Sequence, residues 1–319
     1  MDPIVMFFIL GVVGTLLKIN VKIPHAIYEF LSILLLVAIG LKGGVELAKQ
    51  PIGGVIIEVM VVFMMGIILP LIAYPILKNL GKINRIDAAA IAAHYGSVSV
   101  GTYAVATSYL VATGVSYESH LPLFVVVLEV PAILVGIFLV RGLKSEQESE
   151  HKVQWGKLAH EIFLGKSVYL LMGALTIGYI AGPDKIHTGS EIFKAMFTGV
   201  LALFLLEMGV IAASQLSDVK KYGLFLIGFG TIFPLFSSVI GAVTGAMLGF
   251  SVGGTMIMAT LAASASYIAV PAAFRMAVPE ANPSISIAAA LAITFPFNVT
   301  VGIFIYMWIA EQIVPIIGG

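Results

Sequence analysis

Two short polar segments interrupt long apolar stretches of the sequence. The first reads AAHYGSVSVGTYAVAT from Ala92 to Thr107, and the second reads ATLAASASYIAVPAA from Ala259. Gly, Ser, Val and Thr form helices less readily than Ala or Leu, so both segments predict a break in a helix. A break exposes backbone amides and carbonyls beside the serine and threonine hydroxyls. These residue types suit the binding of a small ion.

The composition places these segments in a membrane. Hydrophobic residues make up 60% of the chain and charged residues 11%, whereas a soluble domain carries roughly 25% charged residues. The formal net charge is zero, so no bulk charge favours nucleic acid as a partner. The chain has no cysteine, which excludes disulfides, thiolate metal sites and cysteine nucleophiles. We expect an all-α integral membrane protein surrounded by lipid.

Ten apolar runs are candidates to cross a hydrocarbon layer of roughly 30 Å. They are Pro3 to Leu17, His25 to Ala48, Gly53 to Leu77, Ile86 to Thr113, Leu121 to Val140, Lys166 to Ala181, Glu191 to Ser214, Tyr222 to Gly249, Val252 to Ala277 and Ser284 to Val314.

The two halves of the chain repeat each other. Residues 27–50 align with residues 192–215, which places Gly44 on Gly209, and Ser97 and Ser99 fall on Ser264 and Ser266. Each repeat holds five spans, an odd number, so the second repeat enters the membrane in the opposite orientation. Inverted repeats of this kind are typical of secondary transporters.

The domain boundaries follow from this repeat. We predict a first five-helix repeat at residues 1–141, a cytoplasmic linker at 142–165 and a second five-helix repeat at 166–319. Within the linker, WGKLAHEIFL predicts an interfacial helix with Trp155, Leu158, Ile162 and Phe163 near one face.

The basic residues predict the orientation of the chain. With the N-terminus outside, the outer loops hold Lys49 and Lys185. The inner loops then hold Lys18, Lys22, Lys78, Lys82, Arg85, Arg141, Lys144, Lys152, Lys157, Lys166, Lys220, Lys221 and Arg275. Cytoplasmic loops carry an excess of Lys and Arg. We therefore expect a protein of the inner (plasma) membrane with both termini on its outer side.

The predicted breaks lie at equivalent positions in the two repeats. Non-helical backbone at membrane depth persists only where it lines a cavity or is buried in protein. Broken transporter helices direct their N-terminal ends at anions and their unwound carbonyls at cations. The alternative is that Ser and Gly only permit close helix packing. Packing alone does not account for the symmetric placement.

A cation at membrane depth needs oxygen ligands and a partner charge. Glu129, in VVVLEVPAIL, is the acid near the centre of the fifth span. The predicted sodium ligands are Glu129, Ser99, Thr260, Ser264, Thr294 and Asn298. A purely structural role for Glu129, bonding backbone freed by Pro131, is the alternative.

Three further polar residues within spans have simpler interpretations. We expect Lys42 and Glu207 to extend toward the membrane surfaces. His94 is expected to be a buried hydrogen-bonding residue, since no second His or Cys lies at metal-ligand spacing.

The segment AAHYGSVSVGTYAVAT, together with ASASYIAVPAA and the two-times-five layout, resembles the sodium-dependent bicarbonate transporter family best known from cyanobacteria. The resemblance implies a trimeric symporter of sodium and bicarbonate. It implies crossed broken helices in a core domain formed by spans 3–5 and 8–10. The gate domain would comprise spans 1, 2, 6 and 7. A PII-like regulatory protein at the cytoplasmic face is also implied, and sodium is the only co-transported ligand, with no other cofactor.

Bicarbonate is a small planar anion that needs several hydrogen-bond donors. Hydroxyls and helix N-terminal amides supply donors without a buried positive charge, and neither break contains Arg or Lys. The predicted substrate residues are Gly96, Ser97, Val98, Ser99, Thr102, Ser264, Ala265, Ser266 and Tyr267. Val98 and Ala265 would act through their backbone amides.

Other functions fit the sequence less well. A sodium symporter of another small organic anion would use the same ion chemistry. A sodium/proton antiporter needs an acidic proton carrier at the crossing, where this chain has Ser and Thr. An enzyme is disfavoured, because no nucleophile elbow, HExxH motif or paired catalytic carboxylates occur.

Overall fold

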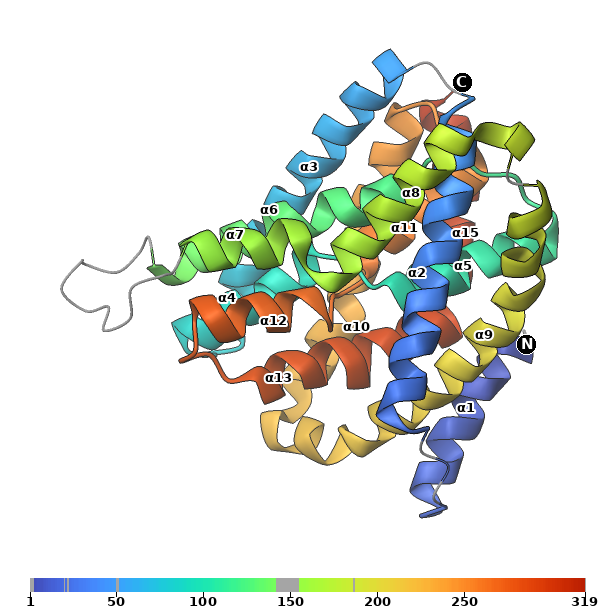
Figure 1. Cartoon of the computed structure of the whole chain (residues 1–319). Helices are drawn as coiled ribbons and strands as arrows, with labels where there is room; N and C mark the ends of the chain where they lie inside the picture. Colours follow the sequence, from blue (N-terminus) through green and yellow to red (C-terminus); the bar gives the residue numbers. More distant parts are fainter. Residues whose placement is uncertain are drawn as a thin grey trace.

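The chain folds into packed helices (Figure 1). The computed structural model describes residues 3–318 apart from residues 20, 22, 50, 51, 142–154 and 186. The first half contains α1 (Pro3–Leu16), α2 (His25–Leu47), α3 (Ile52–Pro75) with a π-helical turn at Ile76–Leu80, α4 (Arg85–Gly96), α5 (Val100–Thr113) and α6 (Pro122–Arg141).

The second half begins with a short helix, α7. It contains α7 (Trp155–Leu164), α8 (Lys166–Lys185), α9 (His187–Ser214), α10 (Leu216–Met247), α11 (Val252–Ala263) and α12 (Ala269–Ala277). The last span combines α13 (Pro283–Ile287), a π-helical segment at Ala288–Thr294, α14 (Phe295–Phe297), a second π-helical segment at Asn298–Gly302 and α15 (Ile303–Ile317).

Six of the described helical stretches are long and apolar enough to cross a membrane, or up to seven if the bent pair α7 and α8 is counted as one span. The chain is therefore an all-α protein with several membrane-spanning helices. The other predicted spans are not among these stretches because each is short or divided. Helix α1 has 14 residues, and the predicted fourth and ninth spans are each divided at a break.

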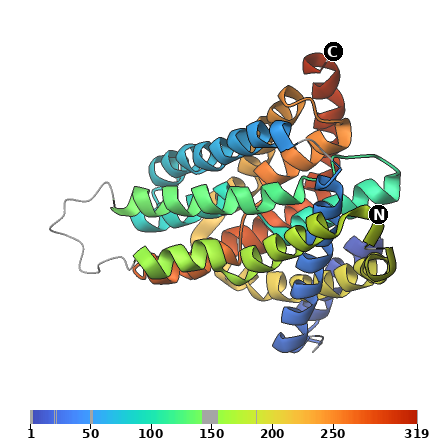
Figure 2. The ribbon, with the colours of Figure 1, turned by 45° about the horizontal axis from the view of Figure 1, so that its top comes forward.

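Three groups of helices pack together within the described part of the chain. Helix α2 packs against α8 and α9, and α1 packs against α9. Helices α3, α4 and α6 pack on one another, as do α10, α11 and α15. Figure 2 shows α1, α2 and α9 gathered on one side, with α3 and α6 extending away from them.

Glycines bring helices of the first group into close contact. Gly44 on α2 faces the backbone of Leu175 on α8. Gly209 on α9 faces the backbone of Phe8 on α1, and a Cβ there would lie 3.0 Å from the amide nitrogen of Val12. Small residues allow such backbone approach between membrane helices. The two glycines that align in the predicted repeat thus make equivalent helix contacts.

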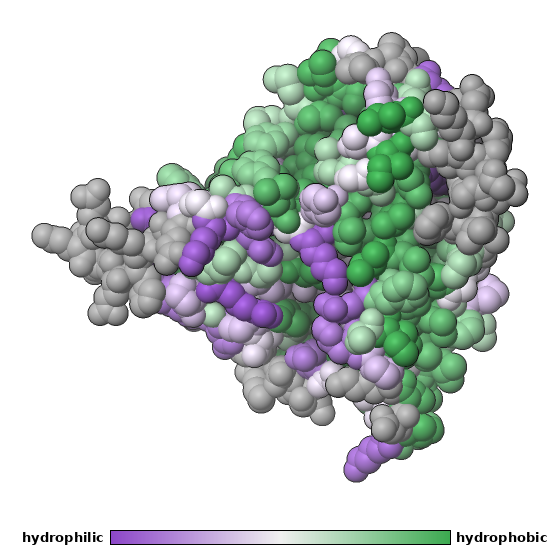
Figure 3. Space-filling view, in the orientation of Figure 1, coloured by the Kyte–Doolittle hydropathy of each residue, from purple (hydrophilic) through white to green (hydrophobic). Residues whose placement is uncertain are grey.

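The outer surface matches a lipid environment. Large apolar side chains point outward from α1 (Met6), α2 (Phe30), α3 (Met60) and α10 (Ile232). Figure 3 shows apolar side chains over α2, whereas hydrophilic side chains gather at the end where α4, α7 and α12 lie. Helices with outward apolar faces are expected in a bilayer.

Helix α7 forms within the predicted linker. Leu158 and Ile162 are buried, whereas Trp155 and Phe163 remain exposed. The four side chains therefore do not share one buried face, because α7 packs against α6, α8 and α12 through Leu158 and Ile162. Linker residues 142–154 lie outside the described residues.

The expectation that Glu207 extends toward the membrane surface is wrong. Its side chain is 2% exposed, and its carboxylate accepts a hydrogen bond of 2.7 Å from the backbone amide of Ile23. The chain between α1 and α2 brings a backbone donor to the carboxylate, so the side chain has no need to reach water. Lys42 is exposed and donates to the hydroxyl of Tyr117 at 2.7 Å.

Candidate functional site

The first predicted break lies where the sequence places it. Helix α4 ends at Gly96, and α5 begins at Val100. Ser97 and Ser99 between them have extended backbone, with φ −99° and ψ −179° at Ser97 and φ −107° and ψ 115° at Ser99. The Ser99 hydroxyl accepts a hydrogen bond of 3.1 Å from the amide of Thr102 and so caps α5.

The second break has the same form. Helix α11 ends at Ala263, Ser264 is extended with ψ 166°, and α12 begins at Ala269 after Ile268. Because Pro271 occupies the third position of α12 and has no amide hydrogen, one unpaired donor of the first turn is removed.

The two breaks contact each other through hydrogen bonds. The amide of Ser99 donates to the Ser264 hydroxyl at 3.1 Å, and the amide of Ser266 donates to the carbonyl of His94 at 2.9 Å. His94 Nδ1 lies 2.5 Å from the Ser266 carbonyl oxygen. His94 is buried, so its predicted role as a buried hydrogen-bonding residue is confirmed. These bonds fix the crossing of the two extended segments.

Gly101 permits a close approach at this crossing. A Cβ at Gly101 would lie 2.7 Å from the hydroxyl oxygen of Tyr267. The glycine thus lets the Tyr267 ring enter beside the start of α5.

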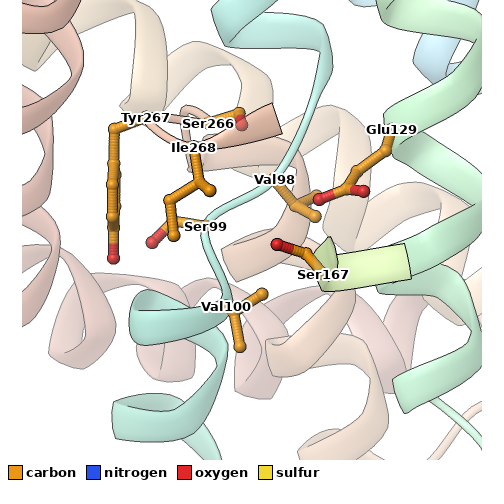
Figure 4. Close-up of a pocket in the computed structure, with 8 residues that line it drawn as sticks. All are labelled: Val98, Ser99, Val100, Glu129, Ser167, Ser266, Tyr267 and Ile268. Carbon is orange, nitrogen blue, oxygen red and sulfur yellow. The ribbon is translucent and has the colours of Figure 1, made fainter. Parts of the chain in front are cut away.

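A small cavity lies beside the crossing (Figure 4). Its volume is about 10 Å³, room for about one water molecule. The lining residues are Val98, Ser99, Val100, Glu129, Ser167, Ser266, Tyr267 and Ile268. The cavity is therefore lined by residues that precede and begin α5, by residues that precede α12, by one residue of α6 and by one residue of α8.

The helix starts at this cavity present unpaired donors. In the described part of the chain, the amides of Val100, Ala269 and Val270 have no hydrogen-bond acceptor. The buried hydroxyls of Ser97, Thr102 and Tyr267 also lack a partner there. Buried polar groups are ordinarily satisfied, and N-terminal ends of helices favour negative charge. The arrangement suits a small anion.

Glu129 brings a negative charge to the same cavity. It is 4% exposed and makes no hydrogen bond or ion pair with any described residue. In Figure 4 its carboxylate and the Ser167 hydroxyl point to the Val98 side of the first break, whereas the Ser99 hydroxyl points toward Tyr267. The alternative structural role, a bond to backbone freed by Pro131, has no such bond to support it among the described residues.

The side chains of four other predicted sodium ligands donate hydrogen bonds to backbone carbonyls. Thr260 donates to the Met256 carbonyl at 2.9 Å, and Ser264 donates to the Leu261 carbonyl at 3.0 Å. Thr294 donates to the Gly230 carbonyl at 2.7 Å. Asn298 donates to the Ala263 carbonyl at 3.0 Å.

Thr294 and Asn298 belong to the two π-helical segments of the last span. Such segments occur frequently at functional sites. Asn298 also accepts a bond of 2.6 Å from the Tyr306 hydroxyl, which orients its amide toward the end of α11.

The structure divides the predicted site residues into two sets. Val98, Ser99, Ser266, Tyr267 and Glu129 line the cavity. The remaining predicted residues are buried around the crossing without lining it: Gly96, Ser97, Thr102, Thr260, Ser264, Ala265, Thr294 and Asn298. The six predicted sodium ligands therefore do not surround this cavity together.

Three lining residues were not predicted. Val100 and Ile268 directly follow residues of the predicted site, so their position next to the breaks was a usable signal. Ser167 carried no such signal, because it reaches the cavity only through the packing of α8.

Comparisons with known proteins bear on the family of this chain. No individually curated protein matches the chain. A family model described as the Na+-dependent bicarbonate transporter superfamily matches residues 3–311, nearly the whole length. The matched region includes both breaks and every residue that lines the cavity. The chain therefore belongs to the Na+-dependent bicarbonate transporter superfamily.

Proposed function

We propose that the protein is a symporter that uses a sodium gradient to drive bicarbonate uptake by alternating access. Membership of a transporter family means that it is not an enzyme. The observation that carries the proposal is that the segments leading into α5 and α12 line one small cavity, and that these helix starts hold donors without partners among the described residues. Donors of this kind bind an anion without a buried cation.

Bicarbonate binds at the crossing in this proposal. The hydroxyls of Ser97, Thr102 and Tyr267 are unpaired within the described residues and so are available to an anion. Bicarbonate has four non-hydrogen atoms, so it needs several times the volume of the cavity, about one water molecule. We therefore expect the elements around the cavity to separate when substrate enters.

Sodium binds beside the anion, with Glu129 as its charge partner. A buried carboxylate without a protein partner is costly unless a cation or a proton neutralises it. Ser99 lines the same cavity and is a second oxygen ligand in the proposal. The assignment of Thr260, Ser264, Thr294 and Asn298 to sodium stays a prediction.

Ten spans in two inverted repeats form the proposed architecture. Support comes from equivalent contacts in the two halves: α2 pairs with α8, and α9 pairs with α1. The gate domain would comprise α1, α2, α8 and α9. The core domain would comprise the remaining spans, with both breaks at its centre.

The orientation and the partners complete the proposal. The basic residues support a plasma-membrane protein with both termini outside. A homotrimeric assembly and a PII-like cytoplasmic partner stay predictions from the family resemblance.

A counterflow experiment tests this function. Liposomes that hold the purified protein are loaded with sodium and unlabelled bicarbonate and then diluted into labelled bicarbonate. We expect transient accumulation of label in sodium and none in choline. Competition by acetate or formate as effective as that by bicarbonate would instead identify an organic-anion symporter. Equal accumulation in sodium and choline would contradict sodium coupling.

Sodium/proton exchange is the second candidate, and one observation favours it: the unpaired Glu129 carboxylate lines the cavity. A pH-sensitive dye inside the liposomes separates the two functions. Exchange predicts that a sodium gradient moves protons in bicarbonate-free buffer. Symport predicts no proton movement under those conditions.

A further inference from the structure

Helix α8 also begins at the cavity. Helices α7 and α8 meet at Gly165 with a bend of 46°. Ser167, in the first turn of α8, lines the cavity opposite the two breaks. The amide of Tyr169 bonds to the Gly165 carbonyl at 2.9 Å, and this is the first bond that the α8 backbone donates.

The first turn of α8 keeps its donors free. Within the described residues, the amides of Lys166, Ser167 and Val168 have no acceptor, and the Ser167 hydroxyl makes no hydrogen bond. Thr176, farther along α8, donates to the Met172 carbonyl at 2.8 Å. Serine and threonine in helices commonly bond in this way. Ser167 therefore holds an uncommitted hydroxyl at the cavity.

Helix α8 is packed with a different group of helices from the breaks. Gly44 of α2 lies against the backbone of Leu175 on α8, so the two helices are held closely together. The breaks belong to α4, α5, α11 and α12, and Glu129 belongs to α6. The cavity thus lies between α8, which packs on α2, and the helices that carry the breaks and Glu129.

The charge of Glu129 would make anion binding at this cavity depend on sodium. Its buried carboxylate, unpaired within the described residues, faces the cavity and repels an anion there. A sodium ion beside it cancels this charge. The three helix starts then attract an anion.

We propose that Ser167 and the first-turn amides of α8 are a third contact for the transported anion, made from the helix group opposite the breaks. The proposal rests on the proposed function and extends its substrate site. An anion held by α5, α12 and α8 contacts both sides of the cavity. Its binding stabilises the packing in which α8 lies against the crossing.

Substitutions at Ser167 test the contact by transport kinetics. Loss of one hydrogen bond to the anion in Ser167→Ala should raise the half-saturating bicarbonate concentration about fivefold. Ser167→Thr keeps the hydroxyl and should restore most of the affinity. Thr176→Val removes a hydroxyl from the same helix and should leave bicarbonate affinity unchanged. Native affinity in Ser167→Ala would overturn the proposal.

Cysteine labelling gives a second test that does not depend on turnover. The chain contains no cysteine, so Ser167→Cys carries the only thiol, and Thr176→Cys is the matched control. In detergent, sodium bicarbonate should slow modification of Ser167→Cys by a small methanethiosulfonate reagent. Sodium chloride should not slow it, and neither salt should affect Thr176→Cys.

The outcomes separate this inference from the proposed function. Sodium-dependent counterflow by the native chain, with Ser167→Cys labelled equally fast in sodium bicarbonate and sodium chloride, overturns the α8 contact and leaves the function standing. Protection of Ser167→Cys by bicarbonate without counterflow by the native chain supports the contact and overturns the transport proposal.

Discussion

Ser97 follows the last residue of α4, and its hydroxyl is fully buried without a partner among the described residues. Such a group costs stability and gains a bond only when a ligand supplies one. Its neighbour Ser99 instead accepts the Thr102 amide and donates its own amide to Ser264. The two serines therefore differ: Ser99 caps α5 at the break, whereas the Ser97 hydroxyl has no partner among the described residues.

The first prediction concerns Ser97→Ala. Since no internal bond is lost, the thermal midpoint should not fall. A lost bond to a charged ligand should raise the half-saturating bicarbonate concentration about tenfold. Ser237→Ala, which removes a buried hydroxyl bonded to the Phe233 carbonyl in α10, is the control and should transport normally. Native affinity in Ser97→Ala would exclude the residue from the site.

The second prediction concerns Glu129→Gln. The amide is close in shape to the carboxylate but carries no charge, so uptake should lose its dependence on sodium while folding is kept. Initial rates of labelled bicarbonate uptake across a sodium series measure this. Glu311→Gln, at an exposed acid of α15, should keep the native sodium response. A native response in Glu129→Gln would contradict the role of Glu129 as charge partner.

At the scale of elements, the sequence predicted both breaks because their cause is local. Ser97 to Ser99 and Ser264 to Ser266 combine poor helix formers with hydroxyls that compete for backbone bonds. The predicted ends of most spans also agree with the helices within a few residues.

Some elements were missed. The π-helical segments around Thr294 and Asn298 were not predicted, although Pro296 between them has no amide hydrogen to donate. Thr294 lies 2.7 Å from the Tyr95 hydroxyl, and Asn298 bonds the end of α11, so contacts between distant segments accompany them. The bend at Gly165 that brings Ser167 to the cavity likewise reflects packing of α7 and α8.

The third prediction tests the glycine contact of α1 and α9. Gly209→Ala places a methyl group against the backbone of Phe8 and should cost about 1–3 kcal/mol of stability. Gly199→Ala on the same helix meets nothing within 4 Å and should be neutral or slightly stabilising. The thermal midpoint in detergent measures both. Equal midpoints for the two variants would contradict the tight packing of α1 and α9.

The equivalent contact on α2 and α8 offers an internal check. Gly44 of α2, which aligns with Gly209, faces the backbone of Leu175 on α8, whereas Gly173 on α8 has open space. If the two halves are inverted copies, Gly44→Ala should destabilise the protein about as much as Gly209→Ala. Gly173→Ala should behave like Gly199→Ala.

At the scale of the whole molecule, the site lies between groups of helices that meet at the cavity. One sodium that travels with one bicarbonate carries no net charge. The membrane potential, worth about 2.3 kcal/mol per charge per 100 mV, then drops out of the driving force. In the proposed symport, the sodium concentration ratio alone would then drive uptake.

The measurement that tests the central claim most directly is the plateau of labelled bicarbonate in liposomes under an inward sodium gradient. A tenfold gradient supplies about 1.4 kcal/mol and should sustain at most about a tenfold bicarbonate gradient. Clamping the potential with potassium and valinomycin should leave this plateau unchanged. A plateau that does not follow the sodium gradient would contradict sodium-driven symport, and one that rises steeply with inside-negative potential would contradict the single sodium at Glu129.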